Sequence, residues 1–145
     1  MKSRRKAPAR RVTDADYAAL ADFRHALRQF LAFSQSAARA AGVPPQQHQA
    51  LLAIKGHAGE PAMTVGKLAE HLLIAPHTAT ELVERLVQGG LLTKHKAPAE
   101  ARRVELALTN RAETILRSLS ETHLAELRRI GPLLTAQLKA IQSRR

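Results

Sequence analysis

The stretch of residues 64–90 constrains the fold of this chain more than any other, because it contains two short amphipathic helices separated by a tight turn. Thr64 can cap the first helix, since its hydroxyl can accept a hydrogen bond from a free amide of the first turn. The apolar residues of that helix recur at helical spacing, at Val65, Leu68, Ala69 and Leu72. Pro76 suits the first position of the second helix, and the glycine pair 89–90 ends it.

The second helix has two faces of different chemistry. Its apolar side consists of Ala79, Leu82, Val83 and Leu86. Its polar side consists of His77, Thr78, Thr80, Glu81, Glu84, Arg85 and Gln88. Two such helices predict a helix-turn-helix, a motif whose second helix enters the major groove of DNA with its N-terminal residues against base edges.

A basic hairpin follows this motif. Residues 91–96 and 104–109 alternate between apolar and polar side chains, as strands do. Residues 97–103 lie between them and include Arg102 and Arg103. We therefore predict a β-hairpin wing and a fold class that is mainly α with a small β-hairpin wing, a winged helix-turn-helix.

Composition limits what the chain can do. Apolar residues make up 45% of its 145 residues, enough for one core, and 23 Lys and Arg against 12 Asp and Glu give a formal charge of +11. That excess favours a polyanionic partner, with nucleic acid ahead of an anionic membrane surface. The chain has no cysteine and no apolar run near the ~20 residues of a membrane span, so we expect a cytoplasmic protein without disulfides.

Apolar helices are expected at both ends of the chain. Residues 1–12 read as a disordered basic tail, which is either an arm that follows DNA or a solvated segment. Residues 13–41 read as one long helix, capped by Thr13 or Asp14 and ended by Gly42 and Pro44, and residues 44–56 as a second helix. The apolar stripe of the long helix includes Leu20, Phe23, Leu27 and Phe30.

The C-terminal part should pair with this first helix. Thr109 or Asn110 can cap another long helix, which Gly131 and Pro132 are expected to break before a short final helix. We expect 13–41 and 110–145 to be dimerisation helices around a winged helix-turn-helix at 44–109, within a single intertwined domain. A two-fold dimer would place its recognition helices ~34–36 Å apart, one turn of B-DNA.

The chain resembles the MarR (multiple antibiotic resistance regulator) family of transcriptional regulators over nearly all of its length after the tail. The matching segments are PPQQHQALLAI (44–54), TVGKLAEHL (64–72), APHTATELVERLVQGGLL (75–92) and EARRVELALT (100–109). The last has the family's wing pattern of an acid, any residue, an arginine and then Leu-Thr, here Glu100, Arg102 and Leu108-Thr109.

This resemblance implies a homodimer that binds a pseudo-palindromic double-stranded DNA operator. Recognition helices would read the major groove and wings the adjacent minor groove. Such proteins usually repress neighbouring genes, and many release DNA when a small, often aromatic, effector binds. The chain departs from the family at three positions: Leu73 replaces the usual glycine of the turn, Ala75 replaces the usual capping residue, and Glu81 stands where a basic or small residue is common.

Individual roles follow from the motif and the resemblance together. Base-edge contacts are expected from His77 and Thr80. Phosphate contacts are expected from Thr64, Thr78 and Arg85. A contact in the narrow minor groove is expected from Arg102 or Arg103. Glu81 could accept a hydrogen bond from cytosine N4 or instead pair with Arg85. An effector pocket is a guess, and its residues would be Phe30, Phe33, His48 and Leu51, with core packing as the competing role.

Other classes of function have less support. The sequence contains no Gly-rich phosphate loop, nucleophile elbow or paired-carboxylate signature, so we do not expect an enzyme or a cofactor. The seven histidines lack the spacing of a metal site, and we expect no metal. The main alternative is an architectural protein that binds DNA without sequence preference through its positive charge. The operator, the target genes, the sign of regulation and the effector are not encoded in any motif.

Overall fold

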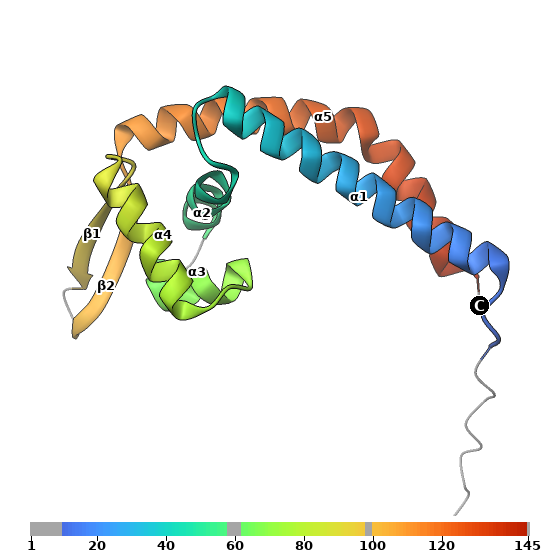
Figure 1. Ribbon diagram of the computed structural model, residues 1–145, viewed down its shortest axis with the longest axis horizontal. Coiled ribbons are helices and arrows are strands. Elements are labelled where there is room, and N and C mark those ends of the chain that lie inside the picture. The colour runs from blue at the N-terminus through green and yellow to red at the C-terminus, as the bar shows by residue number, and fades with distance from the viewer. Residues whose placement is uncertain (1–9, 58–61, 98–99, 145) are drawn as a thin grey trace, which may run out of the picture. The chain divides into compact units, whose positions relative to one another are not determined.

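A computed structural model describes residues 10–57, 62–97 and 100–144, in the last range with side chains from Arg103 onward (Figure 1). Its elements, in chain order, are α1 (Asp14–Ala40), α2 (Pro45–Gly56), α3 (Val65–Leu72), α4 (Pro76–Gln88), β1 (Leu92–Ala97), β2 (Glu100–Leu108) and α5 (Asn110–Ser143). They form two compact units. The winged unit spans Phe33–Leu124, and the terminal unit combines α1 up to Ala32 with α5 from Ala125.

The winged unit contains nearly all of the buried apolar side chains. Leu51, Leu68 and Leu86 come from α2, α3 and α4, and all three are fully buried. The same core includes Ala50, Ala53, Ile54, Met63, Leu82, Val83, Leu91, Leu92, Leu106, Ala112 and Leu116. Because each helix contributes one apolar face, as the spacing predicts, the opposite face of α4 is left for solvent.

The helix-turn-helix is confirmed at residue level. Thr64 is the N-cap of α3 and accepts a hydrogen bond from the Lys67 amide at 3.3 Å. Pro76 opens α4, while Ala75 before it makes no side-chain capping bond. Leu73 takes the left-handed conformation, with φ 57° and ψ 42°, and its side chain is 92% exposed. That conformation is costly for a residue with a Cβ, which explains why glycine is the usual residue there.

The wing is an antiparallel hairpin of β1 and β2, with Leu92 opposite Leu108 and an irregularity after Lys96. β2 begins earlier than predicted, at Glu100, so Arg102 and Arg103 belong to a strand and not to a loop. The Leu106 amide also donates to the Met63 carbonyl at 2.8 Å. This bond attaches the wing to the segment that leads into α3, and it fixes the wing's base within the winged unit.

The expected helix break at Gly131 and Pro132 is wrong, because α5 is continuous and contains Pro132. A proline inside a helix removes one backbone hydrogen bond and crowds the preceding turn. The apolar stripe does not change at this point, since Ile130, Leu133 and Leu134 continue it at helical spacing. We infer that the half-buried side chains of Ile130 and Leu134 help to offset the local cost. Thr109 is the cap of α5, accepting from the Ala112 amide at 3.2 Å.

In the terminal unit, α1 and α5 lie side by side (Figure 1). Thr13 caps α1 in a reciprocal arrangement: its hydroxyl accepts from the Asp16 amide, and the Asp16 carboxylate accepts from the Thr13 amide at 2.9 Å. These bonds from Thr13 lower the pKa of Asp16. Arg144 pairs with the same carboxylate at 3.4 Å.

Of the predicted tail at 1–12, residues 1–9 lie outside the described residues. None of the described helices is long and apolar enough to cross a membrane.

Candidate nucleic-acid interface

The outward face of α4 presents a mixed set of polar side chains. His77, Thr80 and Arg85 are exposed, and Thr78 is half-buried. The Thr80 hydroxyl donates to the Pro76 carbonyl at 3.0 Å, which leaves its oxygen free to accept from a base or a water. Since the other face of α4 is in the core, this helix cannot rotate without losing packing.

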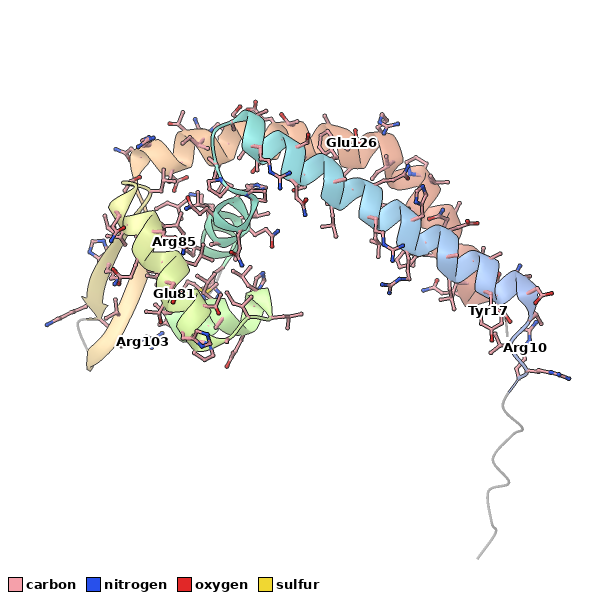
Figure 2. The ribbon with its side chains drawn as sticks, viewed as in Figure 1. Arg10, Tyr17, Glu81, Arg85, Arg103 and Glu126 are labelled. Carbon is pink, nitrogen blue, oxygen red and sulfur yellow. The ribbon has the colours of Figure 1, made fainter. Side chains whose placement is uncertain are left out.

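Two acidic residues on α4 have different surroundings. Glu84 forms an ion pair with Lys94 of β1, which ties the helix to the wing. Glu81 is exposed, and within the described residues it forms no ion pair or hydrogen bond. Arg85 lies one turn after Glu81 on the same helix (Figure 2), and the alternative expectation of a Glu81–Arg85 pair is not met.

The C-terminal end of α4 is held by two hydrogen bonds that the sequence did not predict. The Arg111 guanidinium donates from Nη1 to the Gly89 carbonyl at 3.1 Å. The Thr109 hydroxyl donates to the Gly90 carbonyl at 2.8 Å. Both donors lie about twenty residues further along the chain, so no local pattern could identify them. Together they satisfy carbonyls that a helix end would otherwise leave to water.

Arg103 lies in the first half of β2, beside the start of α3. It lines a hollow together with Thr64, Val65, Gly66 and Val104. Its Nε and Nη2 atoms are buried and have no hydrogen-bond partner among the described residues. The Thr64 hydroxyl already caps α3 in the same hollow. The side chain of Arg102 is outside the described set, so its role in the wing stays a prediction.

The four residues suggested for an effector pocket do not share one cavity. Phe30 belongs to the terminal unit, where it lines a cavity of about 160 Å³ with Glu126 and Ile130. In the winged unit, Leu51 is fully buried in the core. Phe33 and His48 both meet the ring of His123, with centroids 5.6 and 4.9 Å away.

The buried ring of His48 lies against the half-buried ring of His123. The Leu119 carbonyl, 2.6 Å from His123 Nδ1, can only accept, so that nitrogen carries a proton. His123 Nε2 then accepts from the Ser34 hydroxyl at 2.7 Å in the neutral ring. The pKa of His48 is lowered mainly by burial and, to a smaller extent, by the neighbouring His123. His48 is 3% exposed and its Nδ1 has no partner among the described residues.

A family model for MarR proteins matches residues 41–103, which cover the winged helix-turn-helix just described. The winged helix-turn-helix of this chain is therefore of the MarR family. MarR-family proteins are DNA-binding transcriptional regulators and not enzymes, and the chain is a regulator of this class. A search of curated proteins finds no match.

Solved MarR-family structures share the fold. One MarR family transcription regulator is 23% identical, with a TM-score of 0.73 over 88% of this chain and 85% of its own. AbsC from Streptomyces coelicolor is 17% identical, with a TM-score of 0.69 over 83% and 81% of the two chains. A mutant of MepR from Staphylococcus aureus, bound to an oligodeoxyribonucleotide, is 16% identical, with a TM-score of 0.65 over 92% and 98%.

Proposed function

We propose that this MarR-family protein is a dimeric, sequence-specific repressor that releases DNA when a small molecule binds. The observation that carries sequence-specific binding is the outward face of α4, which is polar, exposed and held in orientation by the core and by the Lys94 pair. A rigid helix with short polar side chains near its N-terminus suits the reading of base edges in the major groove.

The individual contacts are proposed from position and chemistry. His77 and Thr80 would face base edges, because both are exposed in the first turns of α4. Thr64, Thr78 and Arg85 would contact phosphate. Arg102 or Arg103 would serve the wing, and the position of Arg103 in the hollow beside Thr64 supports a contact with an anion there.

The dimer is proposed from the terminal unit, whose apolar side chains are poorly covered. Ala26 is its one buried apolar residue among those described. Large apolar side chains remain exposed there at Tyr17, Leu20, Leu27, Leu31, Leu127, Leu133 and Leu138. A second copy of the same two helices would cover this surface with matching apolar side chains, and two-fold pairing is the commonest arrangement.

Effector release is proposed from the joint between α2 and α5 within the winged unit. A cavity of about 300 Å³ lies there, lined by Leu52, Lys55, Gly56, Glu113, Leu116, Arg117 and Ser120. Lys55 and Glu113 form an ion pair at 2.9 Å across the joint. The apolar part of a small acid could contact Leu52 and Leu116. Its carboxylate could bind Arg117, or replace Glu113 as the partner of Lys55. The sequence-based alternative is the set Phe30, Phe33, His48 and Leu51, of which Phe33 and His48 lie together against His123.

Competition binding tests the DNA part of the proposal. Labelled DNA from upstream of the protein's own gene is challenged with unlabelled upstream DNA or with random duplex at fixed salt. A specific regulator should prefer its operator by ~10³-fold or more. Equal competition by both duplexes, with a steep salt dependence, would instead identify an architectural protein driven by the +11 charge.

A ligand screen tests the effector part separately. Aromatic acids are assayed for a rise in the melting temperature of the protein and for release of the upstream DNA. A true effector should do both, because it binds the folded protein and disfavours the DNA-bound form. If no compound that stabilises the protein changes DNA binding, the effector part of the proposal is wrong.

A further inference from the structure

The carboxylate of Glu81 is an unusual feature for a surface that binds DNA. It lies on the exposed face of α4, one residue after Thr80 (Figure 2). Glu84, on the same helix, is neutralised by Lys94, whereas Glu81 forms no ion pair within the described part of the chain, not even with Arg85. An unpaired negative charge in the groove is repelled by the phosphates of both strands. Glu81 therefore reduces affinity for DNA in general.

That cost can be offset only where the DNA offers a hydrogen-bond donor. In the major groove, guanine presents two acceptors and thymine presents an acceptor and a methyl group. Adenine presents a donor at N6, but its N7 acceptor lies beside it and repels the second carboxylate oxygen. Cytosine presents its N4 amino group, a donor. A fixed carboxylate thus discriminates in favour of cytosine and against the other three bases.

We propose that Glu81 is a specificity-determining residue that selects cytosine at one position of each operator half-site. The proposal rests on the proposed function, since it requires α4 to lie in the major groove. Glu81 then contributes by excluding unsuitable sequences more than by adding affinity. Its neighbour His77 can tolerate several bases, because an imidazole can donate or accept, whereas the Thr80 hydroxyl, which donates to the Pro76 carbonyl, is left to accept.

The test measures the base profile of the protein on a pool of duplexes in which the half-site is randomised. The wild-type protein should enrich cytosine at one position per half-site. Glu81→Gln should reduce that preference by on the order of tenfold and shift it towards adenine, whose N6 and N7 a glutamine can contact together. Glu81→Ala should leave the position without preference. Both variants should bind random duplex more tightly than the wild type.

Glu84→Gln is the matched control. It removes the same charge from the same helix, but from a carboxylate that Lys94 already holds. It should raise affinity for random duplex and leave the base profile unchanged. Circular dichroism confirms that each variant is folded, which is expected because both side chains are exposed.

The outcomes separate this inference from the proposed function. If the wild type enriches an operator but Glu81→Gln and Glu81→Ala keep its profile at every position, Glu81 does not determine specificity and the regulator proposal stands. If Glu84→Gln changes the same position as Glu81→Gln, the effect is one of charge and not of base contact. If the wild type enriches no sequence, the proposed function itself is wrong.

Discussion

The two compact units of this protein differ in how completely they bury their own apolar residues. The winged unit encloses Leu51, Leu68, Leu86 and Leu92 with almost no exposure. The terminal unit buries Ala26 among its described apolar residues and leaves large ones such as Leu20 and Leu133 about half exposed. The first unit therefore has a core of its own, while the second has an uncovered apolar surface that the proposed dimer would bury. This difference predicts which substitutions act within one chain and which act between two chains.

The largest effect is expected in the core of the winged unit. Leu86→Ala removes a fully buried side chain from α4 and should lower the free energy of unfolding by about 3 to 4 kcal/mol, through lost burial and a remaining cavity. Urea denaturation measures this change. The loss should be the same over a range of protein concentrations. A loss below 1 kcal/mol would show that the winged unit's core is not what stabilises it.

The next effect is expected in the terminal unit and should appear as dissociation. Leu133→Glu places a charge on the exposed apolar surface of α5 and should weaken the dimer by about 3 kcal/mol, roughly a hundredfold. Sedimentation measures the association. Leu52→Glu is the control, because Leu52 is similarly exposed but lies in the winged unit. If both variants stay dimeric, or if the wild type is a monomer at micromolar concentration, the proposed interface is wrong.

A smaller effect is expected in the turn of the helix-turn-helix. Leu73→Gly should raise the stability of the winged unit by about 0.5 to 1 kcal/mol, because glycine adopts a φ of 57° without the strain of a Cβ. Thermal unfolding measures the gain. Leu73→Ala keeps the strain and removes only an exposed side chain, so it should change little. Equal stabilisation by alanine would point to the side chain and not to the backbone.

The smallest effect concerns pH and the buried His48 of the winged unit. Burial lowers the pKa of His48 in the folded protein. As the pH falls below about 6.5, His48 is therefore protonated in the unfolded chain before it is protonated in the folded one. The stability that comes from a neutral His48 is complete above that pH and declines as the pH falls towards the folded pKa. His48→Leu should therefore flatten the pH dependence of unfolding between neutral and mildly acidic pH. An unchanged profile would show that His48 does not contribute.

Much of the winged unit could be predicted because its signals are local. Thr64, Pro76 and the glycine pair at 89–90 mark helix ends through the chemistry of their own side chains or backbone. The predicted helix break at Pro132 is wrong. The free-energy cost of a proline inside a helix can be offset by apolar contacts with a distant helix, and the sequence near the proline does not reveal them.

The parts of the site that could not be predicted depend on contacts between distant residues. The Glu84–Lys94 pair and the Arg111 bond to Gly89 form only once the hairpin folds back on α4. The His48–His123 pair joins α2 to α5 across a long sequence separation. The type and position of each residue were visible in the sequence, but its partner was not.

The pairing of Lys94 with Glu84 has a consequence for how the protein's charge should be counted. An ammonium group held by a carboxylate of the same chain displaces no cation from the duplex. Lys55 and Arg144 are committed to acids in the same way. The number of ions released on binding, read from the slope of affinity against salt, should therefore fall well short of what the 23 Lys and Arg residues alone would suggest.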